Sequence, residues 1–466
     1  MNTVNKKFLA LSKIFVNVSC SLVNIICNSF FWIKKNQVYL MIYKIWTILL
    51  LFLFIHSDIH AIVFERRKSL SDEIFEYYIV AGPLERPGIG SLITVGAIVN
   101  NIPVPWVEDG KFNLIGGFGK GKGANQFEGQ DMDAYGLTII DFPIFSNNFT
   151  FSPARLTATK FSYPFFERGI HSDPDRKFIL MADKVAQNIG EFSYYFLDRQ
   201  VELFYTFFNA EIDFYGYQDY EGDFVDLRDV EDFGEGTQKW TERWGVLLDD
   251  TDFRRDPRIG YFLKIDRWQW PNRTPQESSW YQYDLEMTGY IPLINMKLIS
   301  VVNQYFSTSK VIKYGKVTKY NCTDQQLLLY PKCQQIVDQA YQRDLIESKK
   351  GRATALGGFE RLRGYPEGRF YDENTNFRAI ELRYYFDPVD INFDVILAKG
   401  FLAEFQLAGF YEQGTVSPDL GEDFWRNFRE SYGFGLRFIT GSAVARFDFG
   451  FSDEGSAVSI WWDYPF

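Results

Sequence analysis

Hydrophobic and polar residues alternate with a period of two along most of the chain from residue 92 to the end, and clusters of Gly, Asp and Asn interrupt the alternation. Such alternation is typical of β-strands, because successive side chains point to opposite faces. We therefore expect an all-β fold with about 16 strands. The clearest candidates lie at 92–102, 133–143, 150–161, 200–217, 237–250, 258–270, 280–292 and 296–309, and segments around 177–198 and 351–357 supply more.

The two faces of the C-terminal strands differ sharply in chemistry. In 402–413, 432–439 and 443–452, one face is aromatic or aliphatic, and the other carries Glu, Arg, Asp or Gly. Charged residues recur in the middle of these polar faces, which a dry core would not tolerate unpaired. In a membrane barrel the apolar face meets lipid and the polar face lines the lumen, so we expect a transmembrane antiparallel barrel. The alternative, a soluble all-β protein, would bury the apolar face.

Composition supports the barrel. Aromatic residues make up 18% of the chain, with 46 Phe, 28 Tyr and 11 Trp, and membrane barrels carry aromatic girdles at both interfaces. No uninterrupted apolar run long enough for a membrane helix follows residue 61. The net charge is −11, and removing the six Lys and one Asp of residues 1–61 leaves 43 basic and 59 acidic residues, or −16. This excess of carboxylates argues against a nucleic-acid partner.

Residues 1–61 read as a leader. Within 41–61, Lys44 precedes an apolar stretch from Ile45 to Ile55, and Ala61 ends an approximate cleavage site. We interpret 41–61 as a secretory signal. Our hypothesis is that translation starts at Met41, and the rival interpretation is that residues 1–40 form an inner-membrane anchor. We then expect a short periplasmic linker at 62–91 and a barrel over 92–466.

The segment 310–350 breaks the alternation and is predicted to be an insertion at one rim of the barrel. It contains a predicted helix at Lys332–Ser348. Cys322 and Cys333 are the only cysteines after the leader. An even count in an exported chain permits a disulfide between them. Two free thiols are the alternative.

The residue types of the segment 357–386 are compatible with an ion pair between an arginine and carboxylates of the following strands. Arg363 cannot lose its proton, and its planar group suits carboxylate partners. Glu381 and Glu412 lie on the predicted lumen faces of the two following strands. Gly364 would let the backbone turn sharply or approach a wall closely. The alternative is an ordinary exposed turn with unrelated charges.

This segment resembles the long loop between the eleventh and twelfth strands of the BamA-like superfamily, also called the bacterial surface-antigen family. The family's Arg-Gly-(Phe/Tyr) core matches Arg363, Gly364 and Tyr365, and its acidic partners match Glu381 and Glu412. The resemblance implies that the loop folds into the barrel and is locked there. A second, weaker match is the Asp-rich turn within 247–265, which includes Asp256.

The last strand also resembles those of outer-membrane barrels. Alternation continued to the end places Val458, Ile460, Trp462, Tyr464 and Phe466 on one side. The resemblance implies that Trp462, Tyr464 and Phe466 form a signal read by the barrel assembly machinery. One departure from the family is that only about 30 residues separate Ala61 from the first predicted strand. We therefore expect a member without periplasmic polypeptide-transport domains.

The resemblance implies a bacterial outer-membrane protein that assists protein insertion or substrate passage across that membrane. Expected partners are outer-membrane lipid, the assembly machinery during biogenesis and a separate periplasmic subunit. In the family, a weak seam joins the first and last strands, here expected near 92–102 and 457–466. A passive channel or surface protein on the same scaffold is the alternative.

Enzyme chemistry finds little support. The stretch GGFGKGKG at 116–123 lacks the Ser or Thr of a phosphate loop and is interpreted as a flexible barrel loop. His171 is the only histidine after the leader, and no GxSxG motif accompanies it. Too few His and Cys residues remain for a zinc site. We expect no catalytic residues, no cofactor and no metal; a phospholipase built on His171 is the enzymatic alternative.

Overall fold

The computed structural model describes residues 75–123, 131–228, 237–271, 278–387, 391–395, 398–440 and 444–466. The predicted leader, with its signal segment at 41–61, lies outside the described residues. Among the helices of the described parts, none has the length and apolar character needed to cross a bilayer.

Strands dominate the described residues, and three helices interrupt them. The strands are β1 (Glu76–Arg86), β2 (Gly90–Pro103), β3 (Lys111–Gly123), β4 (Met132–Ile140), β5 (Phe142–Ser146), β6 (Phe149–Phe166), β7 (Lys177–Phe196), β8 (Val201–Gln218), β9 (Phe224–Asp226), β10 (Thr237–Thr251), β11 (Gly260–Trp270), β12 (Ser279–Ile294), β13 (Leu298–Lys313), β14 (Asn374–Tyr385), β15 (Ile391–Val395), β16 (Ala398–Ser417), β17 (Arg429–Thr440), β18 (Val444–Ser452) and β19 (Gly455–Trp462). The helices are α3 (Asp324–Leu329), α4 (Cys333–Lys350) and α5 (Asp423–Arg426).

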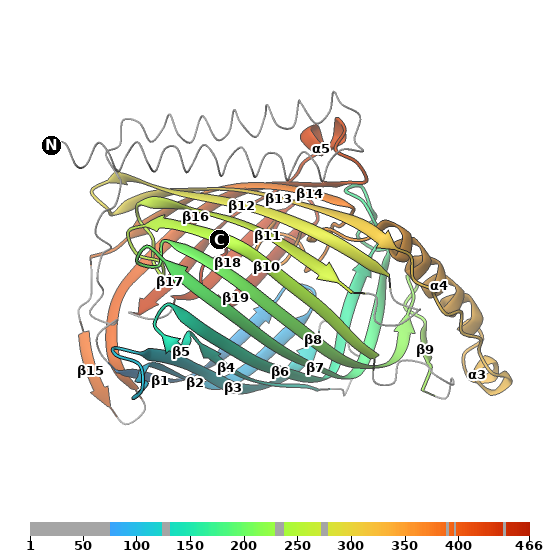
Figure 1. Cartoon of the computed structure of the whole chain (residues 1–466). Helices are drawn as coiled ribbons and strands as arrows, with labels where there is room; N and C mark the ends of the chain where they lie inside the picture. Colours follow the sequence, from blue (N-terminus) through green and yellow to red (C-terminus); the bar gives the residue numbers. More distant parts are fainter. Residues whose placement is uncertain are drawn as a thin grey trace. The chain divides into compact units, whose positions relative to one another are not determined.

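Sixteen of these strands form a closed antiparallel barrel (Figure 1). Each pairs with its neighbour along the chain, and β1 closes the ring by pairing with both β19 and the start of β16. The three remaining strands, β5, β9 and β15, are short additions that pair with β6, β8 and β16. The predicted fold class, an all-β barrel of about 16 strands, is therefore confirmed.

The barrel begins earlier than the sequence pattern indicated. The interval 62–91 was predicted to be a linker, but β1 and the start of β2 lie within it. Strand β1 was missed because Gly82, Pro83 and Pro87 belong to residue types that usually mark turns and loops. The segment 351–357 forms no strand and contributes only a bridge at Leu356.

The glycine-rich stretch 116–123 is also corrected, because it lies inside β3 rather than in a loop. A Cβ atom on Gly121 would lie 2.0 Å from the Ser91 carbonyl oxygen, and one on Gly117 would lie 2.8 Å from the Val95 oxygen. The glycines thus allow β3 to approach the backbone of β2 more closely than side chains would permit.

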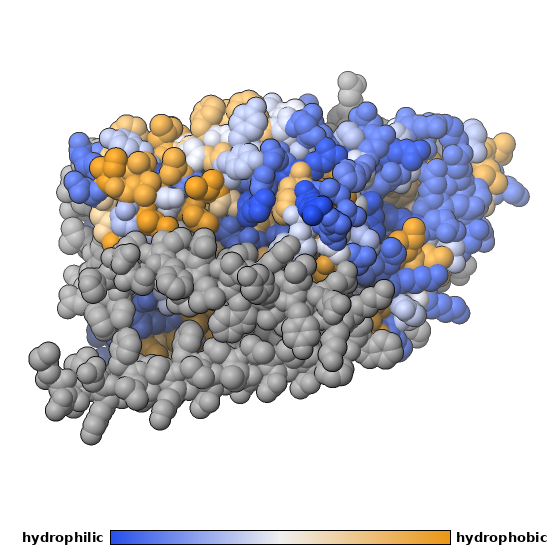
Figure 2. All heavy atoms as spheres, turned by 90° about the horizontal axis from the view of Figure 1, so that it is seen from above, coloured by the Kyte–Doolittle hydropathy of each residue, from blue (hydrophilic) through white to orange (hydrophobic). Residues whose placement is uncertain are grey.

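Alternating faces separate the inside of the barrel from the outside. On β14, Ile380, Leu382 and Tyr384 are between 43% and 45% exposed, whereas Glu381 and Arg383 between them are fully buried. Relative to a soluble protein this pattern is inverted, because apolar side chains are exposed and charged ones are buried. It recurs on β17, where Tyr432 is 60% exposed and Arg437 is fully buried. Figure 2 shows hydrophobic residues gathered toward the left of the visible face, and hydrophilic residues toward the end where α3 and α4 lie in Figure 1.

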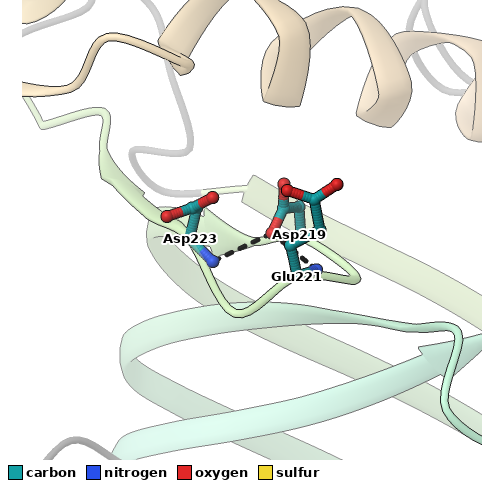
Figure 3. Close-up of side chains that lie close together, drawn as sticks. All are labelled: Asp219, Glu221 and Asp223. Carbon is teal, nitrogen blue, oxygen red and sulfur yellow. Dashed lines mark hydrogen bonds between the residues drawn. The ribbon is translucent and has the colours of Figure 1, made fainter.

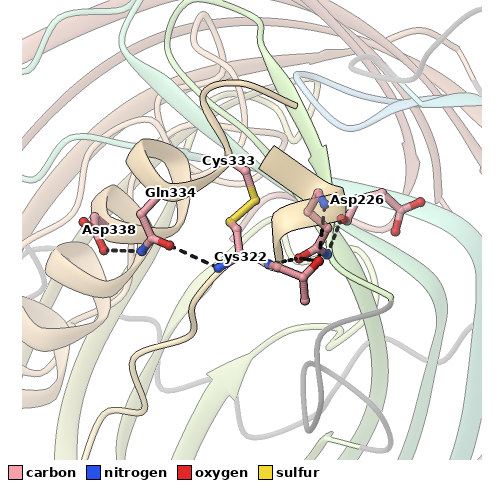
Figure 4. Close-up of a disulfide and its surroundings, with 7 residues drawn as sticks. Asp226, Cys322, Cys333, Gln334 and Asp338 are labelled. Carbon is pink, nitrogen blue, oxygen red and sulfur yellow. Dashed lines mark hydrogen bonds between the residues drawn. A yellow bond between two sulfur atoms is a disulfide. The ribbon is translucent and has the colours of Figure 1, made fainter. Parts of the chain in front are cut away.

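The insertion after β13 carries α3 and α4, close to the predicted position of its helix. Ile336, Val337 and Ala340 of α4 pack on a buried cluster that includes Phe178 of β7 and Tyr217 of β8. A disulfide joins Cys322 to Cys333, with a Cα–Cα distance of 6.2 Å (Figure 4). The disulfide ties the segment before α3 to the first residue of α4.

Candidate functional site

The loop between α4 and β14 folds back on itself. Leu356 and Phe370 form an antiparallel bridge with backbone hydrogen bonds of 2.8 and 3.0 Å. Between them, Leu362 has φ of 55°, a left-handed conformation that reverses the chain just before Arg363. Leu356, Leu362, Tyr365 and Phe370 are all fully buried and form one hydrophobic cluster. Apolar packing therefore presents Arg363 at the tip of a compact loop.

Arg363 is completely buried and bonds to three carboxylates from three strands. Its Nε donates to Glu412 Oε1 at 2.7 Å, Nη2 donates to Glu381 Oε2 at 2.9 Å, and Nη1 donates to Asp448 Oδ2 at 2.8 Å. The Arg363 backbone N–H also donates to Glu412 Oε2 at 2.7 Å. The guanidinium lies 3.5 Å from the centroid of the Phe410 ring. The structure thus brings Arg363, Glu381 and Glu412 together and ties the loop to β14, β16 and β18.

Asp448 was not singled out from the sequence. It lies on the polar face of the strand predicted at 443–452, together with Arg446 and Gly450. Two residues further along β18, an added Cβ on Gly450 would lie 2.2 Å from the Arg363 carbonyl oxygen, a constraint that the sequence alone does not show. Gly364 is likewise constrained, since its Cβ would lie 2.6 Å from the Phe451 oxygen. The backbone of the loop therefore meets the backbone of β18 at Gly364 and Gly450, and Asp448 lies beside that contact.

A second layer of arginines surrounds the same carboxylates. Arg437 Nη1 and Nη2 donate to the two Glu381 oxygens at 2.7 and 2.8 Å, and Arg383 Nε donates to Glu381 Oε1 at 2.7 Å. Arg446 lies 3.4 Å from Asp448. We call these seven side chains the arginine cluster: Arg363, Arg383, Arg437, Arg446, Glu381, Glu412 and Asp448. All are at most 1% exposed, so each charge depends on its neighbours in the cluster for compensation.

Tyr365 fixes the other side of the loop tip. Its ring packs edge-on against Phe370, with centroids 5.0 Å apart. Its hydroxyl donates to Asp453 Oδ1 at 2.5 Å, in the turn between β18 and β19. Burial alone would raise the pKa of Asp453, but hydrogen bonds from Tyr365 and Arg429 outweigh it and lower that pKa below 3.8.

The C-terminal residues depart from the expected alternation. β19 ends at Trp462, and Asp463 has a positive φ of 75°. Tyr464 then enters the lumen, where its hydroxyl donates to Asp256 Oδ1 at 2.6 Å. Phe466 packs against the buried cluster around the loop, with its ring centroid 6.4 Å from that of Phe377. Tyr464 and Phe466 therefore do not share the outer face of Trp462, contrary to the prediction.

The closure between β1 and β19 is short. Within the described residues, the two strands are in register at one pair only, Glu85–Ile460. The start of β1 pairs instead with the extension of β16, at Tyr77–Lys399 and Tyr78–Ala398. By contrast, all 11 residues of β1 pair with β2. We call the β1–β19 junction the seam; its first strand lies at 76–86, not near 92–102 as expected.

Side chains of the loop touch both strands of the seam. The Phe359 ring lies 4.6 Å from the Trp461 ring of β19, and the Arg86 guanidinium lies 4.8 Å from Phe359 and 5.4 Å from Trp461. Arg86 Nη2 also lies 3.2 Å from Glu367 Oε1, and the Glu367 N–H donates to the Pro87 oxygen at 2.7 Å. The loop that carries Arg363 therefore also bridges β1 and β19.

Three carboxylates gather at the turn between β8 and β9, as Figure 3 shows. Asp219 Oδ1 accepts hydrogen bonds from the backbone N–H groups of Glu221 and Asp223, both at 2.9 Å. Lys332 Nζ donates to Glu221 at 2.6 Å and to Asp223 at 2.5 Å, and these bonds raise the pKa of Lys332. The Lys332 ammonium group compensates part of the charge of the three carboxylates, and the contact attaches the start of α4 to the barrel.

His171, the basis of the enzymatic alternative, is exposed in the loop between β6 and β7. Among the described residues, no side chain forms a hydrogen bond with its ring. Its neighbour Ser172 accepts a hydrogen bond from Arg369 Nη1 at 2.7 Å and donates to the Gly169 oxygen. This arrangement offers no base for a serine nucleophile.

Comparison with known proteins yields no matching protein-family model and no matching curated protein. Similar solved structures include BamA from Haemophilus ducreyi lacking POTRA domains 1–3, at 13% identity and a TM-score of 0.43 over 84% of this chain and 69% of that one. CdiB from Escherichia coli matches at 9% identity and a TM-score of 0.49, over 85% and 62% of the two chains. CdiB from Acinetobacter baumannii matches at 12% and 0.43, over 83% and 59%. At these identities the likeness concerns the fold.

Proposed function

We propose that this protein is a bacterial outer-membrane barrel of the BamA-like type that assists insertion of proteins into that membrane or passage of a substrate across it. Its role is non-enzymatic. The membrane location is supported by the inverted faces, since apolar side chains such as Ile380 and Leu382 are exposed while arginines and carboxylates are buried inside. Assembly machinery and a separate periplasmic subunit are the partners that such a role requires.

The observation that carries the proposal is the seam. Away from the closure, neighbouring barrel strands form ladders of six or more residue pairs. At the closure, among the described residues, β1 is in register with β19 at Glu85–Ile460 alone and with β16 at two pairs. Because strand pairing is the main barrier to separating barrel strands in lipid, this junction opens at the lowest cost. The two freed edges can then pair with a strand of a client protein.

The arginine cluster holds the loop while the seam moves. Arg363 anchors the loop to β14, β16 and β18, which form the wall adjoining β19. Phe359 and Glu367 of the same loop contact Trp461 and Arg86 at the seam. The loop thus connects the rigid wall with the strands that separate. A loop buried in the lumen also disfavours a wide, passive channel.

A disulfide across the seam tests this function. The variant Glu85→Cys/Ile460→Cys places two outward-facing cysteines on the registered pair, and Ile79→Cys/Ala97→Cys does the same across the complete β1–β2 ladder. Each full-length variant is reconstituted in liposomes, and the folding rate of a denatured eight-stranded outer-membrane barrel is followed by gel mobility. The disulfide between Cys322 and Cys333 remains in both variants, and wild-type protein with and without reductant serves as reference.

We expect oxidation to suppress accelerated folding about tenfold in the seam variant only, with recovery on reduction. Equal activity of the oxidised seam and control variants would rule out opening of the seam. Steady, large conductance without any acceleration of folding would instead favour the passive channel.

A further inference from the structure

The outer surface of β10–β13 carries a charged residue in an unusual setting. Arg267 of β11 points outward, because its neighbour Asp266 is 4% exposed and bonds to Arg243 inside the barrel. Three aromatic rings surround its guanidinium: Tyr281 at 3.6 Å, Trp244 at 5.4 Å and Tyr283 at 5.8 Å from the ring centroids. Trp244 is 48% exposed, which places the group on the outer face.

Arg267 has no anionic partner among the described residues. No carboxylate lies within ion-pair distance of its guanidinium there, and its buried Nε donates to no acceptor. Most other buried or half-buried arginines of the barrel are paired, as Arg243 is with Asp266 at 2.8 Å. Aromatic faces stabilise the positive charge of Arg267 but leave its N–H donors unused.

Strand register places Arg267 at a boundary between apolar and polar rows. Two residues from Arg267 toward the middle of the strands, the next outward-facing row consists of Val246, Ile265, Leu285 and Phe306. The Arg267 row contains Trp244, Tyr283 and Thr308. One step further, the row turns polar, with Glu242, Gln269, Tyr281 and Lys310. An aromatic row between apolar and polar rows is the signature of a membrane interface.

We propose that Arg267 binds the phosphate group of a membrane lipid, with Lys310 of β13, in the adjacent polar row, as a further cation. The inference rests on the proposed membrane location of the barrel. At the interface, lipid phosphates lie at the level of the aromatic girdle, and a planar guanidinium donates two parallel hydrogen bonds to a phosphate. The exposed ring of Trp244 and the apolar row beneath it offer a surface for the acyl chains of the same lipid. Inorganic phosphate could bind the same cations, but it has no acyl chain to bury on this apolar surface.

Lipid binding to the purified full-length barrel tests the site. Native mass spectrometry in an uncharged detergent measures retention of bis-phosphorylated lipid A, of lipid A treated with a phosphatase, and of inorganic phosphate. The variants are Arg267→Gln, Arg267→Lys and the matched control Arg378→Gln. Arg378 is another outward arginine, 4.4 Å from the Phe428 ring, but it already donates to Gln413 at 2.7 Å. Gel mobility without boiling verifies that every variant folds.

We expect wild-type protein and the control to retain phosphorylated lipid A, Arg267→Gln to bind it roughly tenfold more weakly, and Arg267→Lys to fall between them. Equal retention by Arg267→Gln and wild type would overturn the inference, as would equal retention of the dephosphorylated lipid or effective competition by inorganic phosphate.

Quenching of tryptophan fluorescence by brominated acyl chains separates this inference from the proposed location. If the chains quench the outer tryptophans while Arg267→Gln binds normally, the barrel is in the membrane and only the phosphate site fails. If no quenching occurs and no lipid is retained, the membrane location itself fails.

Discussion

The wall made by β14, β16, β17 and β18 and the seam between β1 and β19 belong to one barrel, yet they are held by different forces. In the wall, complete ladders are reinforced by the arginine cluster, in which seven charged side chains are buried. At the seam, one registered pair is supplemented by side-chain contacts of Arg86, Phe359 and Trp461. The comparison teaches that the loop couples the wall, whose strands are costly to separate, to the seam, whose strands separate at lower free-energy cost.

The largest effect is expected from Arg363→Ala. The substitution leaves Glu381, Glu412 and Asp448 facing one another without their shared partner, and breaking a buried ion pair costs about 3–5 kcal/mol. Thermal unfolding followed by circular dichroism in detergent, with unboiled gel mobility, measures the loss. Arg378→Ala, on the outer face of β14, is the control and should melt like the wild type. A melting profile of Arg363→Ala equal to that control would refute the anchoring role.

A smaller and more local effect is expected from Arg86→Ala. The guanidinium makes two ring contacts and one half-exposed ion pair at the seam, each of which is worth about 1 kcal/mol or less. Hydrogen exchange of the β1 amides near Glu85 should accelerate about tenfold, because local opening depends on these contacts. Amides between β2 and β3 should not change.

The matched control for this variant is Lys120→Ala on β3, away from the seam, which removes an exposed ion pair with Asp131. Faster exchange throughout the barrel in Arg86→Ala would indicate general destabilisation instead of a role at the seam, and unchanged exchange near Glu85 would show that Arg86 contributes nothing there.

The smallest effect is expected from Tyr365→Phe, which removes the hydroxyl donor to Asp453 and costs about 1 kcal/mol at neutral pH. Because the pKa of Asp453 is lowered in the folded state, its carboxylate contributes stability above the unfolded value of 3.8 and loses it as the pH falls through the folded value. The difference in melting between variant and wild type should therefore shrink as the pH is lowered below 3.8. The Tyr365 hydroxyl also lies 3.2 Å from the Glu430 carbonyl oxygen. A difference independent of pH would mean that the hydroxyl acts through that carbonyl alone.

The sequence predicted the barrel because the alternation of β16, β17 and β18 is regular, and it predicted two of the Arg363 partners, Glu381 on β14 and Glu412 on β16. It did not predict β1, whose Gly82 and Pro83 mimic a loop although both lie in a ladder with β2. Strand β3 was mistaken for a loop because glycines signal turns, while here they permit close backbone approach to β2.

Long-range geometry explains the other errors. Asp448 pairs with Arg363 across 85 residues, and nothing local distinguishes it from any lumen-facing carboxylate. Tyr464 and Phe466 continue the period of two in the sequence, but the left-handed backbone at Asp463 turns them inward toward Asp256 and Phe377. Periodicity describes side-chain direction only while the strand lasts.

The inward course of the last residues has a practical consequence for handling the protein. Pro465 is buried and Phe466 lies against the loop cluster, so an affinity tag fused behind Phe466 would begin inside the cylinder and have to thread its way out. Leu328 of α3, 85% exposed, offers a place where a short epitope would meet only solvent.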